Sequence, residues 1–481
     1  MLDDVLRGIR GHYFSMPEWA RAIVGGVYGL LPFRVRMGST FTEFVQLLEK
    51  SRHWSLDQIR AYQYRELKRT IELAYGHIPF YRRHFARAGV TPADLTCLED
   101  IARFPFLTKT DIQEHLGEMT ADHIPAWRRL TTATGGSTTE PMRFWHMKGV
   151  TRSKEKAFIW NQWERFGYRP RARTVLLKGR EAGDPRRGIF WEREPIDNFL
   201  AMNSSHLTEA HLPAYLDAME RFRPEFMIGY VSSIHLLARY LKRHPERAAP
   251  KFRAIFLASE TVYHRQRAEL EGVFRCPVSS HYGHSEMVLL GTECPRDRQL
   301  HFCPQYGLLE LLDENGKPVS EPGAVGELVG TSFHNPVMPF VRYRTQDYGT
   351  LGESRCACHP HHPTLQAVEG RLQEFIVTRD RRLIPISVMC SANIDALDKV
   401  YQTQYYQDTP GTLVFKITPR PGFREEDRQQ IRRAIAEKVG MEVDVRLVAN
   451  IPRTKSGKHL MIEQRIPLNV FRNSHDPDSR R

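Results

Sequence analysis

The sequence predicts an α/β protein with a large N-terminal domain, in which helices flank β-sheets, and a small, mobile α+β domain at the C-terminus. Three observations lead to this prediction. A chain of 481 residues is too long for one ordinary core. Short apolar runs alternate with helical stretches after residue 130, and the pattern changes again after Gly370.

The first 125 residues are expected to be helical. Ser55 is followed three residues later by Gln58, which is the spacing of a capping box. Apolar residues then recur at helical spacing until Gly76, which we expect to end the helix: Leu56, Ile59, Leu67 and Ile71.

The middle of the chain alternates between strands and helices. Strands are expected at Thr174–Leu177, Phe226–Val231 and Ala254–Ala258, with helices at Leu212–Phe222 and Ile234–Arg243 between them. This alternation is typical of a largely parallel sheet. From about 300 to 350 short strands with Gly and Pro turns, such as Val325–Gly330, indicate a β-rich subdomain.

The C-terminal part has a hairpin, a helix and further strands. Acidic residues open a helix at Glu425, and Gly440 closes it. We divide the chain into an N-terminal domain (1–371), a C-terminal domain (372–472) and a disordered polar tail (473–481). In this domain we expect a hairpin in which Phe375–Thr378 pairs with Leu383–Val388. Two further strands are expected at Leu413–Ile417 and Val443–Leu447.

Charge and cysteine content exclude several classes of protein. The formal net charge is +13, but no run of five Lys or Arg and no aromatic RNA-binding pattern occurs. Nucleic-acid binding would therefore rest on charge alone, and a basic surface that favours phosphate ligands is the better interpretation. Seven cysteines are too few for a disulfide scaffold, so we expect a reducing, cytoplasmic compartment.

The N-terminal stretch 17–33 is partly apolar. Glu18, Arg21 and two prolines interrupt it, so it lacks the roughly 20 apolar residues of a membrane-spanning helix. The first residues do not have the pattern of a secretory signal. The expectation is no transmembrane segment, with at most a weak proximity to membranes through this stretch.

Five short motifs carry residues suited to phosphate chemistry. The stretch Thr132–Pro141 is rich in hydroxyls and glycines, which let a backbone approach an anion, although many such clusters are plain turns. In Ser280–Glu286 a carboxylate follows a tight turn, where it can hold magnesium or simply face water. The other three motifs are Arg342–Asp347, Gly370-Arg371 and the basic turn Pro452–Lys458. The alternative for Arg342–Asp347 is an ordinary strand end with an ion pair.

The order and spacing of these motifs resemble the signature series of the adenylate-forming superfamily, which includes acyl-CoA ligases, luciferases and adenylation domains. The resemblance covers at least residues 100–460. The branch is most similar to phenylacetate–CoA ligase-like proteins and, within them, to the capsular-polysaccharide biosynthesis group. The features that indicate the branch are Trp54-Ser55, 74–82, Phe106–Asp111, and the Tyr282–Glu286 motif followed by Glu293-Cys294.

This resemblance implies a role for each matching residue. Lys458 would bridge the substrate carboxylate and the α-phosphate of ATP, near Ser285, and Glu286 would hold Mg²⁺. Asp347 would bind the ribose hydroxyls with support from Arg371. Tyr282, next to Gly283, would stack near the adenine. The residues that would wrap the phosphates are Thr134, Gly135, Gly136, Ser137, Thr138 and Thr139.

The sequence departs from the family pattern at several positions. Thr139 restricts a backbone position where glycine is usual, and Glu140 adds a negative charge near the phosphates. Gln346 replaces a usual glycine, and Gln373 is the expected hinge between the domains. Asp380 stands where CoA ligases carry a glycine that lines the pantetheine tunnel, so CoA remains one acceptor among several.

Four further residues suggest a structural zinc site. Cys294, His301, Cys356 and Cys358 supply three thiolates and an imidazole, which is a complete set of tetrahedral zinc ligands. Some phenylacetate–CoA ligase-like proteins are similar in this region. The alternative is four unrelated residues, and Cys303 and the neighbouring histidines are substitute ligands: His359, His361 and His362.

We therefore expect an AMP-forming ligase that activates a small carboxylic acid with ATP and Mg²⁺. The acyl group would then pass to a thiol, either CoA or a carrier, or to an amine. By analogy with the branch, the expected setting is cell-surface polysaccharide synthesis. The alternative hypothesis is a non-catalytic descendant that binds a nucleotide or a partner. Thr139, Glu140 and Asp380 favour that alternative. Lys458, Glu286 and Asp347 oppose it, because these three positions carry the residues that the chemistry requires. The sequence does not indicate an oligomeric state.

Overall fold

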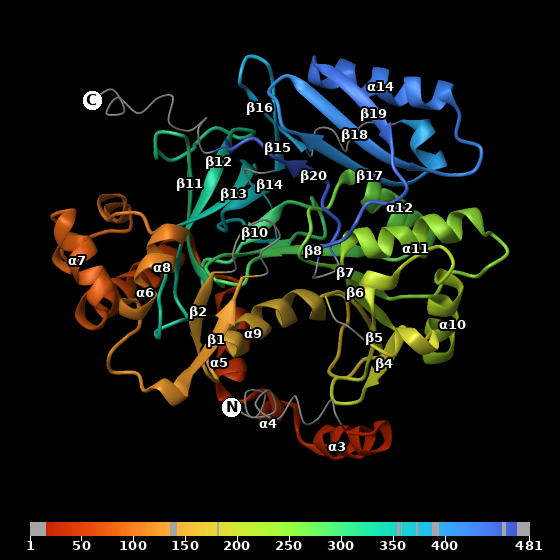
Figure 1. The fold of residues 1–481 in the computed structure, drawn as a ribbon. Coiled ribbons are helices and arrows are strands. Elements are labelled where there is room, and N and C mark those ends of the chain that lie inside the picture. Colours follow the sequence, from red (N-terminus) through yellow and green to blue (C-terminus); the bar gives the residue numbers. More distant parts are fainter. Residues whose placement is uncertain are drawn as a thin grey trace.

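The computed structural model describes residues 16–134, 142–179, 182–353, 356, 358–371, 374–386, 394–454 and 458–468. It confirms the predicted fold class, because a large sheet with flanking helices forms the body and a smaller α+β unit lies on one side of it (Figure 1). The boundaries at 371 and 472 remain predictions, and the tail 473–481 lies outside the described residues.

Helices dominate up to residue 128, as expected. The capping box of α6 forms: the Ser55 hydroxyl accepts from the Gln58 N–H at 3.3 Å, and the Gln58 side chain accepts from the Ser55 N–H at 2.9 Å. The predicted end at Gly76 is wrong by one residue, because Ile78 precedes Pro79 and is pushed to an extended conformation. The helices are α3 (Glu18–Leu30), α4 (Phe33–Met37), α5 (Ser39–Ser51), α6 (Leu56–His77), α7 (Pro79–Arg87) and α8 (Lys109–His115).

The central sheet has twelve strands in the order β11-β12-β13-β14-β10-β9-β8-β7-β6-β3-β5-β4. Only β5, β3, β6, β7 and β8 run parallel to one another, and the other neighbours pair antiparallel. The predicted parallel sheet is thus found in the middle of the chain, whereas the β-rich subdomain expected from about 300 to 350 is antiparallel. The subdomain continues the same sheet, because β8 pairs with β7 on one edge and with β9 on the other.

These strands begin and end close to the apolar runs of the sequence. Their bounds are β3 (Thr174–Leu177), β4 (Trp191–Glu194), β5 (Phe199–Met202), β6 (Phe226–Gly229), β7 (Ala254–Leu257), β8 (Val278–Gly283), β9 (Leu290–Glu293), β10 (Leu300–Phe302), β11 (Gly307–Leu312), β12 (Val325–Ser332), β13 (Tyr343–Leu351) and β14 (Thr364–Arg371). The helices of this region are α9 (Thr151–Glu164), α10 (Leu212–Phe222), α11 (Val231–Arg243) and α12 (His264–Phe274). A separate hairpin joins β1 (Arg129–Ala133) to β2 (Arg143–Met147).

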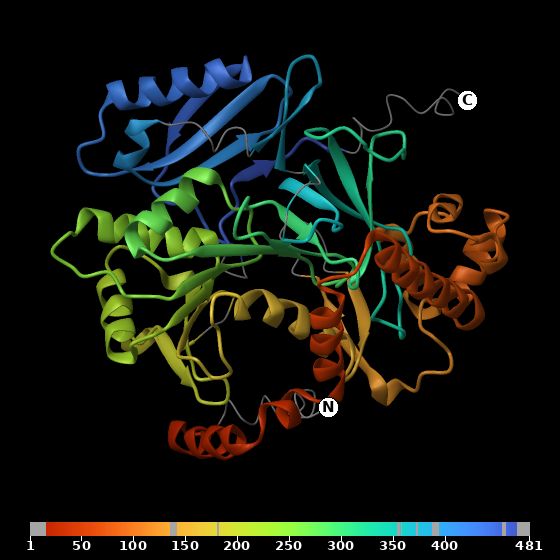
Figure 2. The same ribbon diagram turned by 180° about the vertical axis from the view of Figure 1, so that it is seen from behind.

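The C-terminal unit packs one helix on a four-stranded sheet of order β19-β18-β17-β20 (Figure 2). The helix α14 (Glu425–Val439) ends at Gly440, which adopts φ +62° and donates to the Ala436 carbonyl at 2.8 Å. The predicted hairpin also forms, since Val377 pairs with Leu383. The strands are β15 (Phe375–Val377), β16 (Leu383–Pro385), β17 (Val400–Gln407), β18 (Thr412–Pro419), β19 (Glu442–Leu447) and β20 (Ile462–Gln464).

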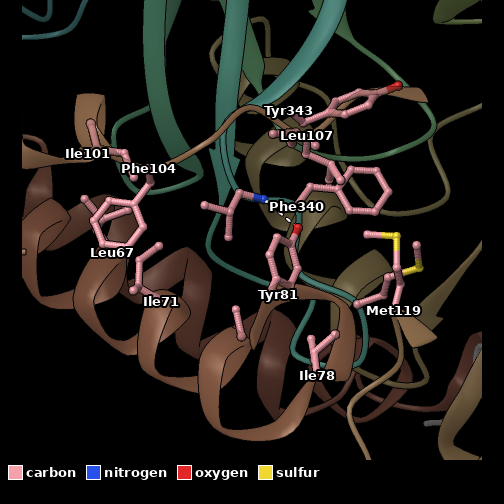
Figure 3. Packing of buried hydrophobic residues seen from close by; sticks show 14 of the residues in the cluster. Leu67, Ile71, Ile78, Tyr81, Ile101, Phe104, Leu107, Met119, Phe340 and Tyr343 are labelled. Atoms are coloured by element: carbon pink, nitrogen blue, oxygen red, sulfur yellow. Dashed lines mark hydrogen bonds between the residues drawn. The ribbon is translucent and has the colours of Figure 1, made fainter. Parts of the chain in front are cut away.

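A buried tyrosine connects the N-terminal helices to the sheet. The side chain of Tyr81 is fully buried in the largest apolar cluster (Figure 3). Its hydroxyl donates to the Pro339 carbonyl at 2.8 Å and accepts from the Val341 N–H at 3.1 Å. These bonds fix the segment that enters β13 at Tyr343, so the helical region sets the position of this strand.

Replacing Tyr81 by Phe should therefore destabilise the protein. The Tyr81→Phe variant leaves the Pro339 carbonyl and the Val341 N–H buried without this partner, which should lower the free energy of unfolding by about 1–3 kcal/mol. Urea unfolding followed by tryptophan fluorescence measures the change. Tyr75→Phe is the matched control, because within the described residues the Tyr75 hydroxyl makes no hydrogen bond while its ring stacks on Phe85. Equal losses in both variants would contradict this account.

Candidate functional site

The candidate site forms where β8 ends between the two halves of the sheet. Crevices of this kind, at the carboxyl ends of parallel strands where the sheet changes direction, commonly bind ligands. The strand β8 brings Tyr282 and Gly283 there, and Ser285 and Glu286 follow in the next turn. From the antiparallel half, β13 brings Asp347 opposite Arg371 of β14.

Asp347 is the centre of the first group of side chains. The Tyr282 hydroxyl donates to Asp347 Oδ2 at 2.7 Å, and Arg371 Nε lies 3.5 Å from Asp347 Oδ1. Burial and the neighbouring Asp347 charge raise the pKa of Tyr282 far above its usual value, so the phenol stays protonated and donates. A carboxylate held in this way can accept hydrogen bonds from hydroxyl groups of a ligand.

Glu286 is the centre of the second group. Its side chain is buried, and it accepts from the Tyr343 hydroxyl at 3.2 Å and lies 3.2 Å from His284 Nδ1. Burial alone would raise the pKa of the Glu286 carboxyl, but the bond to His284 and its charge lower it to about 2. An ionised carboxylate at such a position suits a hard divalent cation.

Lys109 belongs to this group and was missed as a site residue in the sequence. It is the first residue of α8, and its pKa is lowered by burial and by the charge of Arg371, while Glu286 opposes that shift. The only sequence signal was its place in the Phe106–Asp111 motif, which pointed to the branch but to no role. Its ammonium adds a cation close to Glu286 and Arg371.

Lys458 reaches the site from the C-terminal unit. Its Nζ lies 5.8 Å from the centre of the Tyr230 ring, at the end of β6. Burial lowers the pKa of Lys458, and the carboxylates of Glu260 and Glu374 oppose that shift. The lysine therefore faces the same group of acidic side chains as Arg371.

The C-terminal unit is held against the body by polar contacts around Lys458. The His459 N–H donates to Glu260 Oε1 at 3.3 Å, and Arg453 donates to the Ser232 hydroxyl at 3.2 Å. Further along, Arg239 donates to the carbonyls of Leu397 at 2.8 Å and Val400 at 2.7 Å. Sequence analysis singled out Lys458, and Arg453 only as part of the Pro452–Lys458 motif, because nothing in a lone Glu or Arg marks a contact between domains.

Glu374 lies just after the predicted hinge. Burial, and the repulsion of Asp347, raise its pKa to about 7, while Arg371 opposes the shift. Gly370, at φ +101°, passes so close that a Cβ there would overlap the Glu374 carboxyl. This explains why glycine stands before Arg371. Gln346 adopts φ +62°, a conformation that glycine adopts more easily, which explains the residue that the family usually carries there.

The loop that we expect to enclose the phosphates is described only at its beginning. Thr134 closes the β1–β2 hairpin, since its hydroxyl accepts from the Met142 N–H at 2.9 Å and its own N–H donates to the Met142 carbonyl at 2.9 Å. The other expected loop residues, Gly135, Gly136, Ser137, Thr138 and Thr139, lie outside the described residues, as do Glu140 and Gln373.

The four expected metal ligands come together away from this site. Cys294 follows β9, His301 lies on β10, and Cys356 and Cys358 approach from the loop before β14. The Cys294 sulfur lies 3.3 Å from that of Cys356 and 3.4 Å from that of Cys358. These separations are too long for a disulfide and slightly short of the roughly 3.8 Å expected between sulfurs around one tetrahedral zinc.

The surroundings of this cysteine cluster fit a cation. Backbone N–H groups of Arg296 and Cys358 point to the sulfurs of Cys294 and Cys356 at 3.4 Å, as they do around thiolates. Neither ring nitrogen of the buried His301 hydrogen-bonds to another described residue in good geometry. Asp297, which sequence analysis did not include, also brings an oxygen within 4.8 Å of the ligand atoms of Cys294, His301 and Cys356.

Comparison with known proteins agrees with the fold described above. Solved structures of 2-hydroxyisobutyryl-CoA ligase share the fold; one, in a postadenylation state with an acyl-AMP, superposes with a TM-score of 0.67 at 18% identity, over 88% of this chain and 92% of that one. The chain thus shares the fold of this CoA ligase.

Sequence comparison shows which groups of proteins this chain is similar to. Residues 376–465 match the CapK C-terminal domain family. A phenylacetate–coenzyme A ligase of Thermus thermophilus is 27% identical over 84% of this chain and 95% of its own length. Protein CapK of Staphylococcus aureus is 23% identical over 79% of this chain and 83% of its own length. The resemblance to phenylacetate–CoA ligase-like proteins and to the CapK group is therefore confirmed.

Proposed function

We propose that this protein is an ATP-dependent, AMP-forming ligase that converts a carboxylic acid to an acyl-adenylate and then transfers the acyl group. The observation that carries the proposal is the position of Lys458. Lys458 comes from a separate unit of the fold. It nevertheless lies beside Tyr230 and close to the group of charged side chains that contains Asp347 and Arg371. Its relatives named phenylacetate–CoA ligase support the same chemistry.

The proposed chemistry assigns one task to each group. Asp347 and Arg371 hold the ribose, and Tyr282, beside Gly283, lies against the adenine. Residues 134–139 enclose the phosphates, with Ser285 near the α-phosphate. Glu286 holds Mg²⁺, which would neutralise charge on the leaving pyrophosphate. Lys458 stabilises the negative charge that builds up when the substrate carboxylate attacks the α-phosphorus, so it acts mainly in the transition state.

The acceptor of the acyl group is a thiol, either CoA or a carrier, or an amine. CoA ligases among the relatives favour CoA. Asp380 favours another acceptor, because it stands where CoA ligases carry the glycine that lines the pantetheine tunnel. Its exposed carboxylate accepts hydrogen bonds from Thr378 and Arg382 at 2.5 Å in the β15–β16 turn. We further propose that the C-terminal unit, residues 372–472, rotates about Gln373 between the two steps.

The setting that we propose is cell-surface polysaccharide biosynthesis in the cytoplasm. The match of residues 376–465 to the CapK C-terminal domain family supports the first part of this proposal. The six cysteines that the structure describes form no disulfide with one another, which supports the cytoplasmic location.

A test of the proposed function is pyrophosphate release from MgATP with a panel of carboxylic acids, with hydroxylamine added to trap acyl-adenylates. Release that depends on one acid, together with its hydroxamate, would establish the activation step. No release with any acid and no ATP binding by calorimetry would favour a non-catalytic descendant instead.

Lys458→Ala should remove the activation step without unfolding the protein. With the acid identified by the panel, pyrophosphate release should fall by a factor on the order of 10²–10⁴, since a preorganised charge is lost from the transition state. Lys251→Ala, an exposed lysine, is the matched control and should keep full activity. Normal release by Lys458→Ala, with an unchanged melting temperature in both variants, would remove Lys458 from the mechanism.

We also propose that Cys294, His301, Cys356 and Cys358 hold one structural zinc ion. Such an ion would clamp the β9–β10 hairpin to the loop before β14, and four protein ligands would leave it no open position for catalysis. The proximity of three sulfurs and an unbonded imidazole supports this set.

Metal analysis of the purified protein should find about one zinc per chain. Cys356→Ser should lose most of that zinc and unfold at a lower temperature, because the clamp is opened. Cys97→Ser, which removes an exposed cysteine outside the cluster, should keep both the zinc and the stability. A fully folded wild-type preparation free of metal would contradict the site.

A further inference from the structure

The helix α3 presents an uncovered apolar face. Twelve large apolar side chains are exposed among the described residues, and seven of them come from residues 16–35. Those on α3 recur at helical spacing, and the exposed fractions are 69% for Trp19, 58% for Ile23, 62% for Val27 and 84% for Leu30. The others of the seven are Met16, Leu31 and Val35. We call these seven side chains the α3 apolar stripe.

The opposite face of α3 is fixed to the body. Gly25 and Gly29 lie on it, and a Cβ at either position would overlap Pro195 or the Arg171 guanidinium. Arg171 donates to the Gly25 carbonyl at 2.8 Å, and Arg21 Nη1 lies 3.3 Å from Oε2 of Glu192 on the edge strand β4. The helix is therefore anchored with its apolar side outwards, rather than being a loose segment that could turn over.

Charge distinguishes between the surfaces that could cover this stripe. Between residues 19 and 33 the one charged residue is Arg21, which faces inwards. Arg34 and Arg36 follow in the sequence, and Arg186 and Arg187 are exposed in the turn that precedes β4. A second copy of the chain would bring a further +13 charge against the first, whereas an anionic surface would attract it.

We infer that α3 docks the protein onto the interface of an anionic phospholipid bilayer. A helix of 13 residues is about 20 Å long and can lie in the plane of the headgroups with its apolar face inserted. The indole of Trp19 suits the boundary between headgroups and acyl chains. Within the described residues, no helix has both the length and the apolarity to span a bilayer, so the association is peripheral.

The position of α3 is compatible with activity at the membrane. It lies at the end of the molecule opposite the C-terminal unit (Figures 1 and 2). Docking through the α3 apolar stripe would therefore leave the candidate site and the C-terminal unit facing away from the lipid. The inference does not depend on the proposed acid-activating chemistry.

Flotation with lipid vesicles tests the inference. The full-length protein should float with vesicles that contain about a third phosphatidylglycerol, and less with pure phosphatidylcholine or at high salt. The double variant Ile23→Asp/Val27→Asp should bind at least about tenfold more weakly, since two inserted side chains become charged. The matched control Trp127→Asp/Leu447→Asp makes the same charge change at exposed apolar positions elsewhere and should bind like wild type.

Four results would overturn the inference. The first is wild-type protein that stays unbound with anionic vesicles, and the second is a control variant that loses as much binding as the α3 variant. The third is a dimer, seen by analytical ultracentrifugation, that dissolves in the α3 variant. A second measurement applies if the α3 variant fails to fold. The tryptophan emission of the wild type should shift to the blue with anionic vesicles, and Trp19→Phe should lose most of this shift. An equal shift in both proteins would also reject the inference.

Discussion

The strand β8 is the constraint on which the rest of the structure depends. It pairs in parallel with β7 and antiparallel with β9, so it joins two halves of a sheet that would otherwise be separate. Its end delivers Tyr282 to Asp347, which the antiparallel half supplies. A shift of register by one residue at β8 would turn Tyr282 to the other face of the sheet and separate this pair.

The charges around β8 explain how a second unit can pack over the site. Buried ionised groups are stable only when they are paired or hydrogen-bonded. Here the carboxyl groups of Asp347, Glu286, Glu260 and Glu374 interact with the cations of Arg371, Lys109 and Lys458. Because Glu260, Glu374 and Asp347 oppose the effect of burial on Lys458, this lysine can enter the cluster from the C-terminal unit without becoming an isolated buried charge.

Secondary structure was predictable wherever one face of an element is uniformly apolar. The bounds of α10, α14 and β3 agree with the sequence prediction, because a clear apolar face and end signals determine them. The strand β17 was missed for the opposite reason. Its buried positions include Gln404 and Gln407, and the Gln407 side chain bonds to both the N–H and the carbonyl of Val377 instead of packing in an apolar core.

The candidate site was predictable only in part, because some of its residues leave no local pattern in the sequence. Motif residues such as Asp347 and Arg371 could be found because their order along the chain resembles a known series, and the structure places them in register. Lys109, Glu260 and Glu374 join the site through contacts between distant segments. No local pattern marks such contacts, and the continuity of the sheet was hidden because pairing of β8 with β9 is a tertiary feature.

The most direct measurement of the central claim is calorimetric titration of MgATP into the wild-type protein and into Asp347→Asn. The claim is that the side chains gathered at the end of β8 form one nucleotide site. Wild type should bind, and the variant should bind at least about tenfold more weakly, because the amide replaces a charged acceptor of two ribose hydroxyls. Binding that is absent from wild type, or unchanged in the variant, would contradict the account.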